Sequence, residues 1–268
     1  PSGILHIFRL VEEAADNQRV SLRVSLMGPT QVRLPDGSQV DGPLWRRVKV
    51  RSLLALLVLR RGHPIDRQTL LSLLWPDLKR SAALRNLNTT VYNLRHSLEP
   101  QLAHGADSAY IHYKGGKYWL SDERAIWVDI DAFRWHVSRA RESSQTVEAI
   151  ELYQQALDLR RGRFLADLHI AGLPELPEIA EFNQLYLCAL EELGLLHIQL
   201  GEDGSATSIF ERVLSLDPSR QSAMQQLIHL NRGLDERATP LAYCQQLVNT
   251  LQGELDVLLR QESFDAIG

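Results

Sequence analysis

The stretch "LRNLNTTVYNLRHSL", residues 84–98, constrains the fold of this chain more than any other segment. Its apolar residues recur at steps of three and four, which places them on one side of a helix. They are Leu84, Leu87, Val91, Leu94 and Leu98. The other side carries polar and basic residues, and no acidic residue occurs before Glu99. The pattern predicts a helix with one packed side and one side suited to an anion.

Charge is distributed unevenly along the 268 residues, whose formal net charge is −4. Residues 1–128 contain 18 Lys and Arg against 11 Asp and Glu, a net of +7, whereas residues 129–268 contain 11 against 22, a net of −11. Within 45–100 the count is 11 basic against 3 acidic residues. The net charge of two halves of a chain can differ by chance. So wide a difference, however, favours an anion-binding domain followed by a domain with another function.

The segments around the opening stretch predict a small α+β domain. From residue 22, short alternating runs between Pro and Gly breaks predict an antiparallel sheet. Residues 49–61 have helical spacing, and Asp66 and Ser81 are the predicted N-caps of the two helices that follow. Alternation around Gly115-Gly116 predicts a hairpin. Strands, three helices and a final hairpin together predict a winged helix-turn-helix.

Beyond Asp129 the sequence predicts helices alone. The amphipathic stretches are 129–142, 145–160, 175–200, 203–216, 219–233 and 237–260. Small and aromatic residues recur where paired helices would cross, and they are Ala149, Tyr153 and Ala156, then Ala206, Phe210 and Val213. Such recurrence is typical of tetratricopeptide repeats. An irregular helical bundle is the alternative.

The predicted fold class is therefore mainly α with two domains. An α+β winged helix-turn-helix occupies residues 22–125, and an all-α tetratricopeptide-like domain occupies 129–268. Residues 1–21 are interpreted as an N-terminal extension or as a linker from an upstream domain.

The order of these segments resembles the SARP-type bacterial transcriptional activators. In that family an OmpR-type winged helix precedes a bacterial transcriptional activator domain (BTAD). Three of the segments that carry the resemblance are "RSLLALLVLRRGHPIDRQTLLSLLWPD" at 51–77, "VDIDAFRWHVSRA" at 128–140 and "VLSLDPSRQSAMQQLIHLNRG" at 213–233. One departure is Lys117, which precedes Tyr118 where the family usually has Gly. The wing tip is therefore expected to be more basic than in the family.

The resemblance implies a sequence-specific activator that binds promoter repeats and recruits RNA polymerase. It also implies a homodimer on double-stranded DNA, with the helical domain mediating dimerisation or sensing a protein or small-molecule effector. The alternative is a non-catalytic helical-repeat scaffold that binds protein partners without reading DNA sequence.

Residue types assign roles within the predicted DNA-binding domain. The major groove offers base edges to donors and acceptors on one helix, whereas phosphates attract basic groups and helix N-termini. The expected base-contacting residues are Arg85, Asn88, Thr89, Tyr92 and Asn93. The expected phosphate-contacting residues are Arg46, Arg47, Lys49, Arg51, Arg95, His96, Lys114 and Lys117. By resemblance, Lys79 and Arg80 lie in a loop that contacts polymerase. An ordinary solvated surface remains the alternative for each group.

The sequence lacks the motifs of common enzymes. It has no phosphate-binding loop, no His-Glu-x-x-His, no paired-cysteine metal site and no nucleophile elbow. No catalytic residue, metal or cofactor is therefore expected. Cys188 and Cys244 lie in apolar helical patterns and are interpreted as reduced thiols, so a cytoplasmic protein without a membrane segment is expected.

Overall fold

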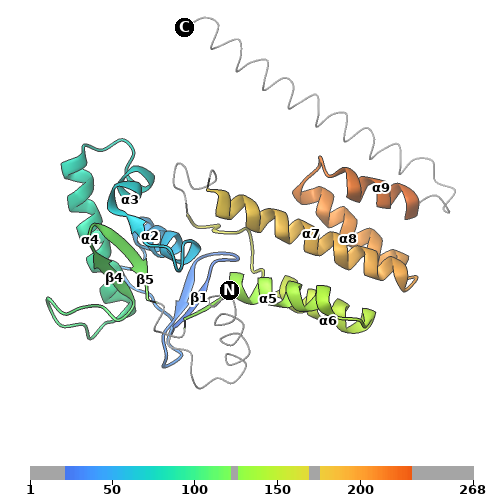
Figure 1. Ribbon diagram of the computed structural model, residues 1–268, viewed down its shortest axis with the longest axis horizontal. Coiled ribbons are helices and arrows are strands. Elements are labelled where there is room, and N and C mark those ends of the chain that lie inside the picture. The colour runs from blue at the N-terminus through green and yellow to red at the C-terminus, as the bar shows by residue number, and fades with distance from the viewer. Residues whose placement is uncertain (1–21, 122–125, 169–175, 231–268) are drawn as a thin grey trace, which may run out of the picture. The chain divides into compact units, whose positions relative to one another are not determined.

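A computed structural model of the chain describes residues 22–121, 126–168 and 176–230 (Figure 1). The predicted N-terminal extension, the predicted helix at 237–260 and Cys244 lie outside the described residues. The chain forms two compact units. The first comprises residues 1–142 and 154–183, and the second comprises 143–153 and 184–268.

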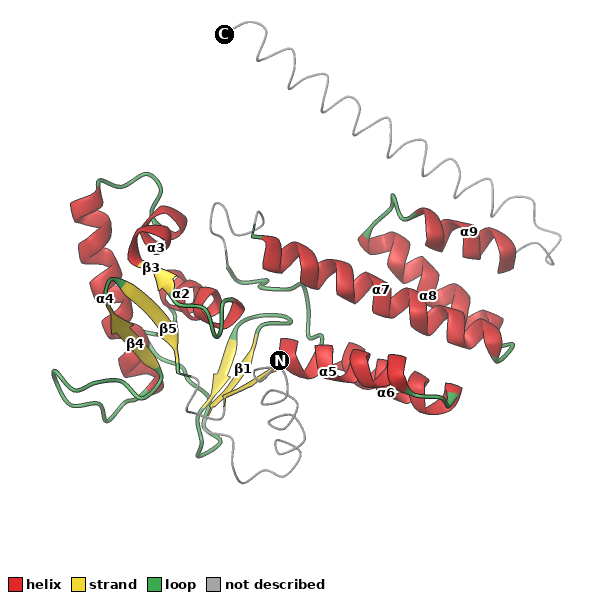
Figure 2. Cartoon of the chain, viewed as in Figure 1, coloured by secondary structure: helices red, strands yellow, loops and turns green. Residues whose placement is uncertain are grey.

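The first sheet of the first unit is built from distant segments of the chain (Figure 2). Strands β1 (Leu22–Ser25) and β2 (Gln31–Arg33) are antiparallel, as the alternating sequence predicts. Strand β6 (Ile126–Val128) pairs with β1 in the parallel direction, so the strand order is β2-β1-β6. The sequence pattern does not predict β6. The residues directly before the helical region therefore complete the N-terminal sheet.

Three helices lie between β2 and β6 along the chain. They are α2 (Val48–Leu59), α3 (Arg67–Leu74) and α4 (Arg80–Leu98). Helix α4 packs on both α2 and α3, and Leu87 and Leu94 on its inner side are fully buried. Asp66 is the N-cap of α3, as predicted, although its side chain makes no capping hydrogen bond. The prediction for Ser81 is wrong, because α4 begins one residue earlier and Lys79 is its N-cap.

The second sheet ends in the predicted hairpin. Strands β4 (Ile111–Lys114) and β5 (Lys117–Leu120) are antiparallel, and the two-residue β3 (Ile65–Asp66) pairs with the other edge of β5. Gly115 and Gly116 have φ angles of 59° and 83°, which suit a tight turn that other residues adopt at a cost. Together with α2, α3 and α4 these strands form the predicted winged helix-turn-helix.

The remaining described elements are helical, as predicted. They are α5 (Asp129–Glu142), α6 (Thr146–Asp158), α7 (Pro177–Gln199), α8 (Asp203–Leu216) and α9 (Gln221–Leu230). The six small and aromatic residues of the predicted crossings are all buried. In the second unit α8 packs against α9, and a Cβ added at Gly194 of α7 would lie 2.8 Å from the ring of Phe210. A small residue facing an aromatic ring thus lets α7 and α8 approach closely, as in tetratricopeptide pairs.

Buried charges join the start of the helical region to the first sheet. The carboxylate of Asp129 accepts hydrogen bonds from the backbone N–H groups of Leu26 and Met27 at 2.7–2.9 Å. Burial raises the pKa of Asp129 to about 6, although these hydrogen bonds and Arg161 at 4.0 Å oppose the rise. Nearby, Asp131 pairs with Arg61 at 3.1 Å, and burial also raises the pKa of Asp131. Residues 129–131 therefore belong physically to the winged-helix unit.

Candidate nucleic-acid interface

The outer side of α4 is polar, exposed and free of carboxylates. Arg85, Asn88, Thr89 and Tyr92 are all exposed, and Tyr92 is 49% exposed despite its size. The ring of Tyr92 stacks on His96 with 4.0 Å between ring centroids, which fixes the direction of its hydroxyl. Thr89 donates its hydroxyl to the carbonyl of Arg85 and keeps its acceptor lone pairs free for a ligand. This side of α4 can present donors, acceptors and an aromatic edge to one groove of DNA.

The structure corrects one of the expected base-contacting residues. Asn93 is only 4% exposed, so its side-chain amide is not available to a base edge. Asn86, seven residues earlier and on the same side of the helix, is exposed instead. The sequence pattern does not single out Asn86. Its signal was its position two turns before Asn93 on the same side of α4.

A groove of about 290 Å³ runs between the start of α2, the end of α3 and α4. Its lining includes Arg47, Lys49, Trp75 and Asn86. Arg47 is the N-cap of α2, and the first turn of α2 has no acidic residue. The first amide groups and the positive end of the helix dipole therefore face this groove with an exposed guanidinium beside them, an arrangement that favours phosphate.

The other basic residues near the start of α2 already have some partners within the protein. Lys49 donates one hydrogen bond from Nζ to the carbonyl of Leu74 at 2.6 Å, which leaves two ammonium donors. Arg46 forms a solvent-exposed ion pair with Asp41, and the hydrogen bond between them lowers the pKa of Asp41 and raises that of Arg46. So exposed a pair is weak, which leaves Arg46 able to exchange Asp41 for a phosphate.

Two of the expected phosphate-contacting residues have interior partners instead. Arg51 is 15% exposed at its side chain and pairs with Asp167. Arg95 donates a hydrogen bond from Nη2 to the carbonyl of Ile111 at 2.8 Å and so ties α4 to the hairpin. The structure corrects both expectations, because each guanidinium is engaged by a group of the protein, Arg51 by Asp167 and Arg95 by the carbonyl of Ile111, instead of being turned outward to a phosphate.

The tip of the hairpin concentrates positive charge. Lys114 and Lys117 lie directly opposite each other across the two strands, and both side chains are exposed. Neither lysine has an ion-pair partner in the described part of the chain. Two like charges in this position repel each other, so an anion placed between them relieves the repulsion. This geometry suits a phosphate contact.

Lys79 and Arg80 are exposed at the turn between α3 and α4. The neighbouring Leu78 is 43% exposed, so the turn presents an apolar residue beside two positive charges. Such a combination suits a protein partner more than bare DNA.

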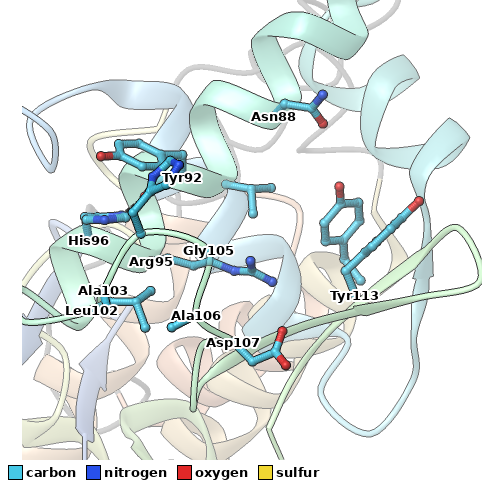
Figure 3. Close-up of a pocket in the computed structure, with 13 residues that line it drawn as sticks. Asn88, Tyr92, Arg95, His96, Leu102, Ala103, Gly105, Ala106, Asp107 and Tyr113 are labelled. Carbon is cyan, nitrogen blue, oxygen red and sulfur yellow. Dashed lines mark hydrogen bonds between the residues drawn. The ribbon is translucent and has the colours of Figure 1, made fainter.

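A cavity of about 420 Å³ lies between the C-terminal half of α4, the loop at 102–107 and the hairpin (Figure 3). Tyr92, Arg95 and His96 of α4 line it together with Tyr113 of β4. This cavity therefore borders both the outer side of α4, at Asn88 and Tyr92, and the hairpin, at Tyr113.

Other classes of site are absent from the residues that the structure describes. Within 22–121, 126–168 and 176–230, no cluster of three or more His, Cys, Asp or Glu residues is arranged to hold a metal ion. Over the same ranges, no helix is both long enough and apolar enough to cross a membrane.

These features define a winged-helix transcriptional regulator, and comparisons with known proteins agree. The family described as "Transcriptional regulatory protein, C terminal" matches residues 43–120, and the family described as "Bacterial transcriptional activator domain" matches residues 128–264. The chain belongs to the SARP family of bacterial transcriptional activators. DNA-binding regulation of transcription is therefore its class of function.

Individual relatives cover most of the chain. It is 27% identical over 246 residues to the regulatory protein DnrI of Streptomyces peucetius, covering 88% of this chain and 87% of the relative. It is 27% identical over 251 residues to the transcriptional regulatory protein MoaR1 of Mycobacterium tuberculosis, covering 88% of this chain and 75% of the relative. A structure of Mycobacterium tuberculosis EmbR in complex with a low-affinity phosphopeptide matches with a TM-score of 0.67 and 22% identity. That match covers 88% of this chain but only 61% of the EmbR chain, and it shows a shared fold.

Proposed function

We propose that this chain activates transcription by reading a promoter sequence through α4 and by bringing RNA polymerase to that promoter. The observation that carries the proposal is the exposed, carboxylate-free side of α4, which is flanked by a helix N-terminus and by a lysine pair. A major groove accepts one helix, while phosphates on either side need positive groups at a distance from it.

The proposed DNA contact of each residue follows from the chemistry of its side chain. Arg85 is assigned to a guanine edge, because its planar guanidinium can donate two hydrogen bonds to O6 and N7. Asn86 and Asn88 are assigned to adenine edges, and Thr89 and Tyr92 to thymine methyls or nearby acceptors. Phosphate contacts are assigned to residues that keep an accessible positive group or imidazole ring, and they are Arg46, Arg47, Lys49, His96, Lys114 and Lys117.

The test is selection of bound duplexes from a random DNA library by the full chain at a fixed salt concentration. The expected result is an enriched motif whose affinity exceeds that of a scrambled duplex by about a thousandfold or more. Uniform retention of all sequences would instead favour a basic surface without sequence readout. The scaffold alternative predicts no retention at moderate salt.

We also propose that two copies occupy adjacent direct repeats. One recognition helix covers too few base pairs for strong discrimination, and half-sites one helical turn apart place two copies on the same side of the duplex. The second unit is the proposed site of dimer contact or effector binding, since its described helices expose Leu195, Leu200 and Leu216. Sedimentation of the complex with the selected duplex should give two chains per duplex. One chain per duplex at micromolar protein would contradict this.

The turn before α4 is proposed to contact RNA polymerase. Replacing Lys79 and Arg80 together by Ala should leave affinity for the selected duplex within about threefold while lowering transcript yield with purified polymerase, because interface residues on separate surfaces act independently. Equal loss of binding and transcription would place these two residues on DNA instead.

A further inference from the structure

Arg51 carries a positive charge one turn into α2 but directs it into the protein. Its Nε atom lies 2.7 Å from Oδ2 of Asp167. The Nε–H bond is not aligned on that oxygen, so the contact is an ion pair without a directed hydrogen bond. Nη1 of the same guanidinium donates to the carbonyl of Arg46 at 2.9 Å. Arg51 thus connects the turn that enters α2 to a carboxylate 116 positions later in the sequence.

The other oxygen of Asp167 is also occupied. Oδ1 accepts a hydrogen bond from the backbone N–H of Thr30 at 2.8 Å and another from the Thr30 hydroxyl at 2.9 Å. Thr30 is 5% exposed. The carboxylate is therefore held on both sides, by the loop between β1 and β2 and by α2.

The backbone around Asp167 is fixed as well. The N–H of Arg161 donates to the carbonyl of Met27 at 2.7 Å, and the N–H of Leu165 donates to the carbonyl of Leu26 at 3.0 Å. Gly28 has a φ of 154°, and a Cβ there would lie 3.1 Å from Cβ of Arg161, so the close approach of the two segments depends on glycine. Residues 161–167 consequently form a rigid bracket against the first sheet.

We propose that Asp167 is a positioning residue for DNA binding. Through Arg51 it fixes the turn at Trp45 and Arg46, and thereby sets the direction in which Arg47 and the first amide groups of α2 face a phosphate. The inference rests on the proposed DNA-binding function. A preorganised phosphate site does not have to be ordered when DNA binds, so it binds more tightly than a mobile one.

A purely electrostatic effect and a positioning effect of Asp167 predict opposite changes in DNA affinity for the same substitution. Asp167→Asn removes a negative charge close to the phosphate-binding end of α2, and charge alone would therefore strengthen binding to every duplex. If Asp167 acts by positioning, the same substitution loosens Arg51 and the turn at 45–46. Binding should then weaken although the protein has become more positive.

The experiment measures affinity of the full chain for the duplex selected from the random library and for a scrambled duplex. Asp167→Asn and Arg51→Met should each weaken binding to both duplexes by about two- to thirtyfold, the range expected when a residue acts through a neighbour. The double variant should bind DNA no more weakly than the single variant with the lower affinity, since both substitutions break the same connection. Asp41→Asn is the matched control, because it removes the carboxylate of an exposed pair at the same helix start, and it should bind as well as the wild type or better.

A second measurement guards against loss of the fold. Thermal unfolding checks that each variant is folded. A further variant, Thr30→Val, removes only the hydroxyl donor to Asp167. Amide hydrogen exchange at residues 45–49, measured without DNA, should be faster in Asp167→Asn and in Thr30→Val than in the wild type. Unchanged exchange in both folded variants overturns the inference.

Failure of the inference and failure of the proposed function are distinguishable. If Asp167→Asn binds as well as the wild type while Arg47→Ala weakens binding, DNA binding stands and the positioning role is wrong. If the wild-type chain prefers no duplex, the proposed function is wrong, and the exchange measurement still decides whether Asp167 orders the start of α2.

Discussion

Two regions of the first unit use charge in opposite ways. The proposed DNA-facing surface consists of the outer side of α4, the start of α2 and the wing tip. It exposes polar and basic groups with few internal partners. The inner seam consists of Asp129, Asp131 and Asp167 with the groups that they bind. Its carboxylates, buried at Asp129 and half-buried at Asp131 and Asp167, are paired with backbone amides and arginines. A buried charge must be paired to be tolerated, whereas an exposed one remains available to a ligand. The comparison implies that the seam determines stability and the surface determines binding.

The largest effect should come from removing a carboxylate of the seam. Asp129→Ala leaves the N–H groups of Leu26 and Met27 without their acceptor, and it should lower the free energy of unfolding by about 2–5 kcal/mol. Urea unfolding followed by circular dichroism measures this. Thr89→Ala on the DNA-facing surface is the matched control and should change stability by less than about 0.5 kcal/mol. Similar losses in both variants would break the comparison.

Stability should also respond to pH through Asp129. Its folded pKa of about 6 lies above the ordinary value of 3.8, so between these values the folded state binds more protons than the unfolded state. The contribution of the group is therefore complete below about pH 4 and is lost as the pH rises through 6, by about 3 kcal/mol in total. The difference in unfolding free energy between wild type and Asp129→Asn isolates this slope from that of Asp131. A difference that is constant from pH 4 to 7 would contradict it.

On the DNA-facing surface, Arg85→Ala should weaken binding to the selected duplex by about 1–3 kcal/mol and relax preference at one base pair. Binding to a scrambled duplex should change little, because a guanine edge is present only where the motif places guanine. Titrations of both duplexes measure the two effects. Equal weakening on both would make α4 a basic surface and remove its recognition role.

The smallest and most uniform effect should come from the wing tip. Replacing Lys114 and Lys117 together by Ala should weaken binding to all duplexes, and the salt dependence should fall by about one unit of slope for each phosphate that the variant no longer binds. Affinity measured across a salt series separates this effect from base readout. A sequence-dependent weakening would instead place the wing among the base-reading elements.

Much of this surface could be predicted from the sequence because it depends on local patterns. The spacing of Leu87, Val91 and Leu94 defines the inner side of α4, and the glycine pair defines the hairpin. The failures concern contacts between distant segments. Asn86 and Asn93 share one side of the helix and border the same groove at the start of α2, yet the packing of the folded chain leaves Asn86 exposed and buries Asn93. Similarly, the local sequence does not distinguish Arg51 from Arg47, because the ion pair of Arg51 with Asp167 forms only in the folded chain.

The parallel pairing of β6 with β1 determines where the sequences of two relatives can be joined in a hybrid protein. A hybrid regulator cut at residue 125, where the sequence changes from hairpin to helix, would take β6, Asp129 and the bracket at 161–167 from a different parent than the sheet they complete. Such a hybrid has to re-establish a strand pairing and several buried charge contacts at once. A junction within α7 near residue 183, where the first compact unit ends, keeps all of them in one parent. In this chain the inheritable module for DNA binding is therefore longer than the winged helix itself.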